Sequence, residues 1–522
     1  MMAAAKGSPD KLEGAILVLI TACVASFVVS YNNTALITAL PAVKLDLDMK
    51  AAALQWVMNS YMLAAACLVV VMGRFSDIFG KMRLFLFGVV VFAASSLALI
   101  FVENTATMLG FRFLQGVGAS SVFSNSAALI NVTTPTPDRP FTMGIWAGVV
   151  TFGLGVGPLV GGFYTEVFNW RLIFATDVVL LLIALFLAWR VEKLGIVTPQ
   201  PEKRETIDYL GAGLLVVTLA SLVYAVSHGH ASGWTSPAIM ILLVVGFAGT
   251  AAFYIVEHRT KNPLVHFVLF ENRSYVGATI AMFVIGFVLI GSLFFFNLFL
   301  QSPSSLHLTA IHAGLAVLPM TIPMLLISVG LPRRLERHHF RWAITAGMLA
   351  LAIGFGLLSL STNQTVYSEV WWKFAIVGCG LGLTFPLIPT VGLRDLADHH
   401  AGQGAGVVNT CLFIGAVVGV VVGGLVTAEV GHDMVAEAIR TVSHVPGNAA
   451  ELAHLFAHGA PGEVKQALTT FSAEDAAHIR SALADLEDDT FDAVMIAMMI
   501  VSFIGMIASA TLMRDNPTGK SA

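Results

Sequence analysis

The chain has 522 residues, of which 57% are hydrophobic and 11% are charged, and its formal net charge is −4. Soluble domains carry roughly 25% charged residues because their surfaces must stay hydrated, so most of this chain's surface cannot face water. The slight acidity gives no indication of a nucleic-acid or polyanionic partner. Together with a mean hydropathy of +0.82, this composition predicts a polytopic α-helical membrane protein.

Fourteen apolar runs are long enough to cross a membrane. A helix needs about 20 apolar residues to cross ~30 Å of hydrocarbon, and continuous apolar runs do not resemble the alternating strands of a barrel. We therefore predict an all-α fold with 14 transmembrane helices. The predicted spans are 14–41, 52–72, 82–102, 105–129, 141–165, 171–190, 207–227, 237–257, 274–300, 309–332, 342–361, 370–393, 401–427 and 490–513.

The distribution of basic residues predicts the orientation of these spans. If the N-terminus lies in the cytoplasm, 20 of the 28 Lys and Arg residues fall in cytoplasmic segments. Seven fall outside, three of them in one long segment whose charges count little, and Arg112 lies within a span. Cytoplasmic loops carry the excess of Lys and Arg in membrane proteins. We therefore expect a multi-pass protein of the cell membrane with both termini in the cytoplasm.

The loop between the second and third spans contains a motif, Gly73-Arg-Phe-Ser-Asp-Ile-Phe-Gly-Lys-Met-Arg83. Its glycines allow a tight cytoplasmic turn, and its acid can pair with the basic residues. The spacing resembles the pattern G-x-L-[AS]-D-x-x-G-[RK]-[RK] of the major facilitator superfamily, with Phe75 and Met82 as departures. The resemblance implies that this loop holds one gating conformation. The matching residues are Gly73, Asp77, Gly80, Lys81 and Arg83.

The fourth and fifth spans resemble two further motifs of that family. Leu109–Gly118 contains Arg112 and Gln115 in the pattern R-x-x-Q-G-x-G of drug:proton antiporters. The fifth span matches the antiporter motif G-x-x-x-G-P-x-x-G-G without a gap. Glycines at helical spacing let two backbones approach closely, and a proline inside a helix removes a hydrogen bond and bends it. The residues that match the antiporter motif are Gly153, Gly157, Pro158, Gly161 and Gly162.

The sixth span begins Trp170-Arg-Leu-Ile-Phe174, similar to the W-R-W-I-F of the 14-helix drug:proton antiporter branch, the QacA/EmrB-like group. This resemblance implies a six-helix bundle at 1–195, an inserted helix pair at 196–272 and a second six-helix bundle at 273–522. Transport would then proceed by rocking of one bundle against the other.

The second bundle would carry an extracellular helical loop at about 428–490. Helical patterns lie at 434–442, 449–458 and 473–486, and Ser472 precedes the last with Asp475 in capping-box spacing. The resemblance implies that this segment is the extracellular hairpin known in the branch.

Two residues depart from the branch in complementary ways. Asn32 stands where the first span usually has an acid that handles protons, and Asp177 stands where the sixth span usually has Asn. Asp177 is the only acid, and Arg112 the only Arg or Lys, well inside any predicted span, and such residues cost roughly 2.5–3.5 kcal/mol to insert. Either Asp177 handles protons with Arg112 as its partner, or the two form a structural pair, or Asp177 lies near enough to the surface to stay hydrated. The residues predicted to line the proton and substrate cavity are Asn32, Arg112, Gln115 and Asp177.

The family resemblance implies a secondary active exporter of amphipathic small molecules such as drugs, coupled to protons and working by alternating access. The alternative is a facilitator or exporter of one lipid, siderophore or metabolite that is not coupled through the usual first-helix acid. The sequence has no phosphate-binding loop and no metalloprotease motif, so an enzyme is not expected. We expect no cofactor, no metal site and no nucleic acid, and a monomer in the lipid bilayer that binds a small-molecule substrate and protons.

Overall fold

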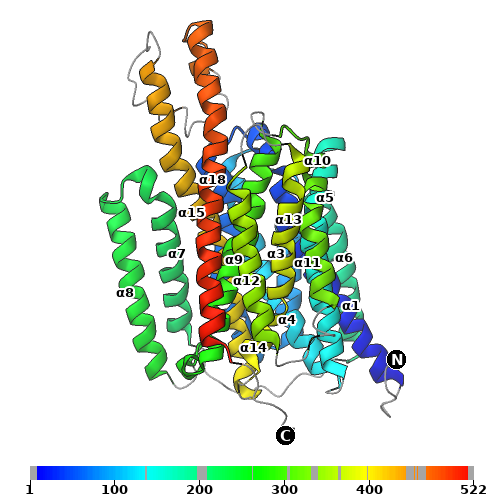
Figure 1. Cartoon of the computed structure of the whole chain (residues 1–522). Helices are drawn as coiled ribbons and strands as arrows, with labels where there is room; N and C mark the ends of the chain where they lie inside the picture. The colour runs from blue at the N-terminus through cyan, green and yellow to red at the C-terminus, as the bar shows by residue number, and fades with distance from the viewer. Residues whose placement is uncertain are drawn as a thin grey trace.

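In the part of the chain that the computed structural model describes, helices are joined by turns and irregular segments, and this part contains no β-strand (Figure 1). The structure describes all residues except 1–8, 136–137, 197–207, 261–262, 303–305, 331–334, 336–338, 362–365, 395, 397, 442–451, 453–454, 456–465 and 515–522. The elements are α1 Pro9–Asp46, α2 Ala51–Phe79, α3 Lys81–Leu99, α4 Thr105–Thr133, α5 Arg139–Val167, α6 Leu172–Lys193, α7 Tyr209–Ser232, α8 Pro237–Arg259, the 3-10 helix η2 Phe267–Glu271, α9 Arg273–Gln301, α10 Ala310–Ala316, α11 Leu318–Gly330, α12 Phe340–Leu358, α13 Tyr367–Thr384, α14 Leu387–Leu393, α15 Asp398–Thr441 and α18 Ala473–Leu512.

Twelve helices in the described part of the chain are long and apolar enough to cross a membrane, with α13 and α14 counted as one, and α10 with α11 makes a thirteenth. The remaining predicted span is α4, which has 29 residues but is more polar because it carries Arg112, Gln115 and Asn125. It packs against α2 and α3, so these polar side chains lie inside the protein. The predicted all-α membrane fold is confirmed.

Two spans are interrupted rather than continuous. The predicted run 309–332 is divided into α10 and α11, whose axes differ by 41°. Pro319 follows this break, and Pro386 lies in the gap between α13 and α14. A proline lacks the backbone N–H that a helix needs and its ring clashes with the preceding turn, which explains both interruptions.

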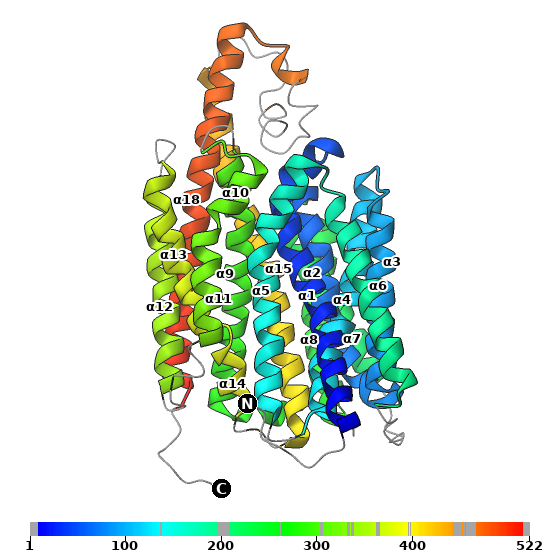
Figure 2. The same cartoon turned by 90° about the vertical axis from the view of Figure 1, so that its right-hand side faces the viewer.

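The helices form two groups, which lie side by side in Figure 2, and a separate pair, which stands at the left of Figure 1. In the first group, α1 packs against α5 and α6, and α4 packs against α2 and α3. In the second, α9 packs against α15 and α18, and α12 packs against α13 and α18. The groups meet where α5 contacts α10 and α11 and where α2 contacts α15. Helices α7 and α8 pack on each other, and α7 touches both α2 and α15, so this pair lies against one junction of the two groups.

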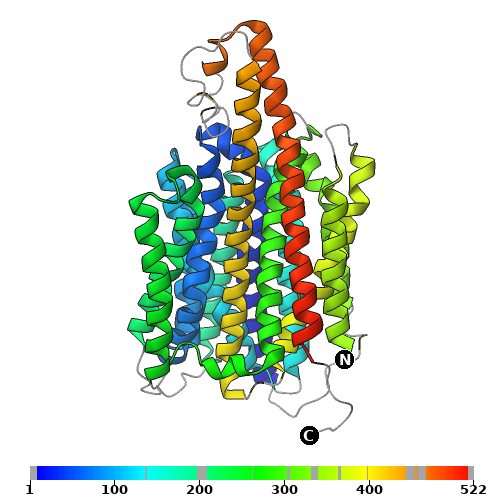
Figure 3. The same cartoon turned by 60° about the vertical axis from the view of Figure 1, so that its left-hand side comes forward.

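Helices α15 and α18 are longer than a membrane span and project together beyond the bundle (Figure 3). They project at the end opposite to the one where α1 begins and α18 ends (Figure 1). The helical patterns at 434–442 and 473–486 are therefore extensions of spanning helices, while most of 449–458 lies outside the described residues. Ser472 Oγ accepts a hydrogen bond from Asp475 N at 3.1 Å, which confirms the predicted cap.

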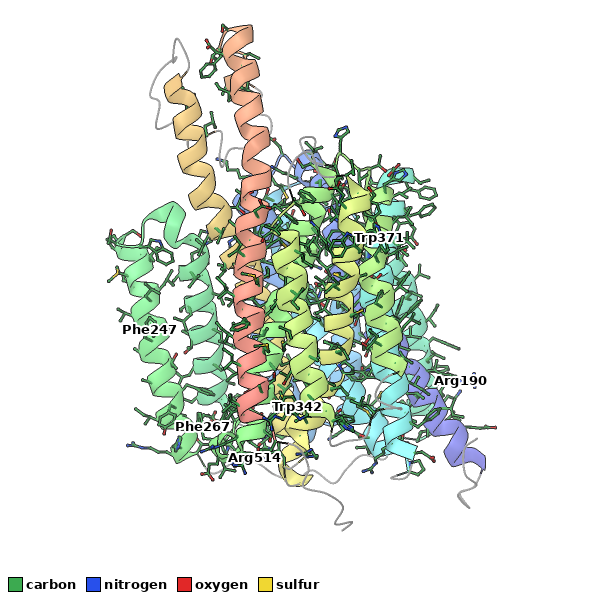
Figure 4. The ribbon with its side chains drawn as sticks, in the orientation of Figure 1. Arg190, Phe247, Phe267, Trp342, Trp371 and Arg514 are labelled. Atoms are coloured by element: carbon green, nitrogen blue, oxygen red, sulfur yellow. The ribbon has the colours of Figure 1, made fainter. Side chains whose placement is uncertain are left out.

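The outer surface of the bundle is apolar along its middle and carries tryptophans at both ends. Phe247 on α8 is 67% exposed, and Trp342 and Trp371 lie at opposite ends of the bundle (Figure 4). Arg190 and Arg514 lie toward the end where Trp342 is found (Figure 4). Tryptophan is enriched where a membrane meets water, and apolar side chains face the lipid between these belts. This pattern identifies a multi-pass membrane protein.

Candidate functional site

Four residues predicted to form a cavity site meet inside the first helix group. Asn32 comes from α1, Arg112 and Gln115 from α4, and Asp177 from α6, and all four are 0% exposed. Arg112 and Gln115 are three residues apart, so they lie on the same side of α4. The contacts of α1 with α4 and α6 bring the other two residues to them. The structure thus brings the four residues together, and their role stays a prediction.

Arg112 is held by three hydrogen bonds. Its Nη1 donates to Asn32 Oδ1 at 2.8 Å and to Gln115 Oε1 at 2.6 Å, and its Nε donates to the Val57 carbonyl of α2 at 3.1 Å. A buried guanidinium is costly unless its donors have partners. These bonds fix its position between α1, α2 and α4.

Asp177 completes a closed ring of hydrogen bonds. Its Oδ2 accepts from Asn32 Nδ2 at 2.6 Å and from Ser96 Oγ of α3 at 3.4 Å. Gln115 Nε2 in turn donates to Ser96 Oγ at 2.7 Å. The ring therefore runs from Arg112 through Asn32, Asp177, Ser96 and Gln115 back to Arg112. Two buried atoms in the ring's residues have no hydrogen-bond partner, Arg112 Nη2 and Asp177 Oδ1.

Tyr61 is a member of this cluster that the sequence did not identify as such. Its ring lies 4.4 Å from the guanidinium carbon of Arg112, and its hydroxyl donates to the Val29 carbonyl at 3.4 Å. A cation over an aromatic face is attracted by the ring quadrupole, most strongly where water is absent. From the sequence, Tyr61 is one of several polar residues within the spans, some of which are expected to line a cavity, and Ser96 carries no signal because Ser in a span most often forms ordinary contacts between helices.

A cavity of about 40 Å³ lies between the two helix groups. Residues of α1, α2, α4, α5, α9 and α15 line it, most of them apolar, and its polar members are Ser30, Asn33 and Tyr61. Ser30 Oγ and Asn33 Oδ1 have no hydrogen-bond partner. Because each water needs roughly 10–15 Å³ of such space, the cavity has room for a few waters and not for a larger molecule. The two helix groups are therefore closed around this cavity.

The glycines of α5 form its contact with α1. A Cβ added at Gly157 would lie 2.9 Å from both the Ala35 nitrogen and the Tyr31 oxygen. An added Cβ at Gly153 or Gly161 would also meet the α1 backbone. Only glycine allows two helix backbones to approach this closely. The predicted close-packed face therefore lies against α1.

The same motif also contacts the second helix group. A Cβ at Gly162 would meet the Ala310 carbonyl, and a Cβ at Gly314 of α10 would lie 2.5 Å from the Pro158 oxygen. Pro158 lies inside α5 without ending that helix. The motif is thus in contact with both groups at the end where α10 lies.

Hydrogen bonds between the groups reinforce closure at this end. Gln301 Nε2 of α9 donates to the Thr38 carbonyl of α1 at 2.9 Å. Ile311 N of α10 donates to Glu166 Oε2 of α5 at 2.9 Å. Any opening of this end must break these two contacts.

The motif between α2 and α3 forms a one-residue turn. Gly80 has φ of +98°, a conformation that residues with a side chain rarely adopt, and it joins the ends of the two helices. A Cβ at Gly73 would lie 2.9 Å from Ser124 Oγ of α4. Lys81 is half-buried and Arg83 is exposed, while the side chain of Asp77 lies outside the described part of the structure. The turn is confirmed, and its gating role stays a prediction.

Comparisons with known proteins agree with this architecture. Residues 22–420 match the family model described as Major Facilitator Superfamily. Cephamycin export protein CmcT of Amycolatopsis lactamdurans is 32% identical, over 80% of this chain and 86% of that protein. Puromycin resistance protein pur8 of Streptomyces alboniger is 32% identical, over 80% and 82%. Multidrug resistance protein Stp of Mycobacterium tuberculosis is 28% identical, over 79% and 76%.

Two solved structures share the fold. A bacterial homologue of the human lysosomal transporter Spinster, inward-facing and unoccupied, has a TM-score of 0.62 at 14% identity, with 98% of this chain and 100% of that chain covered. A peptide transporter POT in complex with sulfate has a TM-score of 0.59 at 15% identity, with 96% of each chain covered. At these identities the likeness concerns the fold alone, whereas the family model covers most of the chain. The chain belongs to the Major Facilitator Superfamily.

Proposed function

We propose that this protein exports amphipathic small molecules, such as antibiotics, across the cell membrane in exchange for protons. The observation that supports this most is the closed ring of hydrogen bonds that contains Asp177. Tyr61 contacts Arg112 of this ring and also lines the central cavity, so the titratable group and the cavity are connected through one residue. A titratable group in a membrane span is a functional hypothesis by default. The names of relatives that match most of the chain, which include an export protein and resistance proteins, support the direction and the class of cargo.

Asp177 is the proton carrier in this proposal. It takes the role of the first-span acid that the family resemblance implies and that is Asn32 in this chain. Its Oδ2 accepts both hydrogen bonds of the ring, and its Oδ1 has no partner. A proton can therefore bind Oδ1 without breaking any bond of the ring. Asn32 keeps Arg112 beside the acid in both protonation states by donating to one residue and accepting from the other.

The two faces of α5 supply the conformational change. Close backbone contact with α1 makes the first helix group move as one body, while the contacts of Gly162 and Pro158 with α10 lie between the groups. Rocking would break the contacts of Gln301 and Glu166 and open the end where α10 lies. We infer that this end is extracellular and that both termini are cytoplasmic, which follows from the distribution of Lys and Arg.

The cavity favours cargo that is largely apolar. Among its described lining residues there is no Asp, Glu, Lys or Arg, while Ser30 and Asn33 offer free hydrogen-bonding atoms. Such a surface favours a ligand with a large apolar area and a few polar groups. It gives no counter-charge for a polycation.

Flux measurements in proteoliposomes test this function. The purified protein is reconstituted, and counterflow of puromycin and of a cephamycin is followed with and without an imposed proton gradient. We expect the gradient to accelerate movement of at least one of them toward the acidic side. Equal flux with and without the gradient for both antibiotics would contradict the proposal.

A second candidate is an uncoupled facilitator or exporter of one lipid, siderophore or metabolite. The observation in its favour is that Asn32 cannot titrate and that the ring of hydrogen bonds could act as a purely structural brace. Flux of such a cargo that ignores the proton gradient would support this alternative.

A further inference from the structure

We propose that Tyr61 is a cargo-sensitive positioning residue, which holds the Arg112 guanidinium away from Asp177 until cargo displaces its ring. This inference rests on the proposed function, because it explains how an occupied cavity could be linked to the protonation of Asp177. It concerns a residue of α2 that lies outside the motifs described above.

The two unpartnered atoms of the cluster belong to a guanidinium and a carboxyl group, which carry opposite charges when both are ionised. Arg112 Nη2 has no hydrogen-bond partner, and neither does Asp177 Oδ1. In the closed state, Arg112 reaches Asp177 through Asn32, with one hydrogen bond of 2.8 Å and one of 2.6 Å. A direct Nη2–Oδ1 pair would satisfy both atoms, and a guanidinium and a carboxylate form strong paired hydrogen bonds. The closed state therefore leaves a second arrangement of the same residues available.

Tyr61 contacts Arg112 and also lines the central cavity. Its ring lies under the guanidinium at 4.4 Å, which compensates for the donor that lacks a partner. The same residue lines the central cavity with Asn33 and Ser30. The cavity holds only about 40 Å³, so a cargo molecule must push lining residues outward to enter. Displacement of the Tyr61 ring removes the cation–π contact and frees Arg112 to move.

The consequence is a coupled proton transfer. When Arg112 pairs directly with the Asp177 carboxylate, the proton that Oδ1 carried leaves to water in the conformation in which the helix groups have opened to one side of the membrane. When cargo departs, Tyr61 returns under Arg112 and Asp177 binds a proton again. The other titratable side chains beside this cluster are Tyr61 on α2, Tyr31 on α1 and Tyr164 on α5. A tyrosine hydroxyl has an ordinary pKa of about 10, so the transfer falls to Asp177.

Infrared spectroscopy of the purified full-length protein tests the switch without transport. The C=O stretching band of a protonated carboxylic acid is assigned to Asp177 by its loss in Asp177→Asn. Tyr61→Phe keeps the ring under the guanidinium, whereas Tyr61→Leu removes it. Phe92→Leu is the matched control, because Phe92 is a buried aromatic whose ring lies edge-on to Tyr61 at 6.4 Å.

We expect the Asp177 band in the wild type, in Tyr61→Phe and in Phe92→Leu at the same pH. In Tyr61→Leu it should weaken by about 30-fold, the factor that corresponds to the roughly 2 kcal/mol of a desolvated cation–π contact. A band of wild-type strength in Tyr61→Leu, or no such band in the wild type, would overturn the inference.

A second arm tests the action of cargo. Saturating puromycin should weaken the band in the wild type and in Tyr61→Phe, and an unchanged band with puromycin bound, as measured by equilibrium dialysis, would overturn it. The outcomes also separate this inference from the proposed function. If the infrared pattern is as expected but flux does not respond to the proton gradient, only the proposed function is contradicted. If flux responds to the gradient but the band is unchanged in Tyr61→Leu, only the role of Tyr61 is contradicted.

Discussion

Arg112 on α4 and Asp177 on α6 are connected through the side chain of Asn32, which accepts from the arginine at 2.8 Å and donates to the aspartate at 2.6 Å. An asparagine can do both at once because its amide carries an acceptor and a donor, whereas an ionised aspartate could only accept. The family resemblance implies an acid in the first span and an amide in the sixth, and this chain has the amide Asn32 on α1 and the acid Asp177 on α6. Such an exchange keeps one carboxyl group in the cluster, on α6 instead of α1.

This relationship predicts the outcome of reversing the exchange. The double variant Asn32→Asp with Asp177→Asn places the carboxylate directly against Arg112 Nη1 and leaves an amide on α6 to bond with it. We expect gradient-dependent flux to exceed that of Asp177→Asn alone but to reach at most about half of the wild-type value. The reason is that Ser96 and Gln115 remain placed for a carboxyl group on α6 and an amide on α1. Proteoliposome flux measures this. A double variant as uncoupled as Asp177→Asn would show that the position of the acid matters.

Bulk at the contact between α5 and α1 should impair transport more than folding. The added Cβ of Gly157→Ala would lie 2.9 Å from two α1 backbone atoms. Overpacking of this kind costs roughly 1–3 kcal/mol, which changes a conformational equilibrium by about 5- to 150-fold. We expect the flux of Gly157→Ala to decrease by a factor within that range, while the protein remains monodisperse in size-exclusion chromatography.

Gly148→Ala is the control for this prediction. Gly148 lies on the same helix, and its added Cβ would be 3.6 Å from Val329 Cγ2, an ordinary contact. Its flux should match the wild type. If Gly157→Ala also transports at the wild-type rate, the close contact of α5 with α1 plays no part in the cycle.

Cysteine labelling tests the orientation of the chain. Leu45 at the end of α1 is 69% exposed, and Leu194 after α6 is 61% exposed, at the opposite end of the bundle. In a background without the native cysteines, Leu45→Cys should react with an impermeant maleimide added to intact cells. Leu194→Cys should react only after the cells are opened. Reversed reactivity would place both termini outside.

The sequence predicted the spans and the motifs well because membrane helices consist of long apolar runs and because close helix contacts require glycine. It did not predict which faces meet. Helices that are apolar on all sides give no amphipathic pattern to orient them, since lipid and protein interior are similar environments. Asp177 and Arg112 could be placed near each other only because charged residues are rare in spans, whereas the contact of Tyr61 with Arg112 and the place of Ser96 in the ring required the structure. The bend between α10 and α11 had a local signal in Pro319 that a hydropathy count ignores.

The exposed length of α15 and α18 had a similar cause. Polar residues after an apolar run mark the end of the membrane and not the end of the helix, so the sequence predicts separate helices at 434–442 and 473–486 where α15 and α18 are continuous. The cap at Ser472 was predictable because Asp475 follows it at the spacing that a capped helix start requires.

Asp177→Asn tests the central claim most directly. The substituted amide can still accept from Asn32 Nδ2, so the ring of hydrogen bonds can persist while the titratable group is lost. The measurement is the flux of puromycin in proteoliposomes with and without a proton gradient, together with the melting temperature of the purified variant. If Asp177 carries the proton, the gradient should no longer accelerate flux, and binding and melting temperature should stay near the wild-type values. Flux that still responds to the gradient as in the wild type would contradict the account. A melting temperature lowered by the several degrees that a few kcal/mol of lost stability produces would instead identify Asp177 as a structural partner of Arg112.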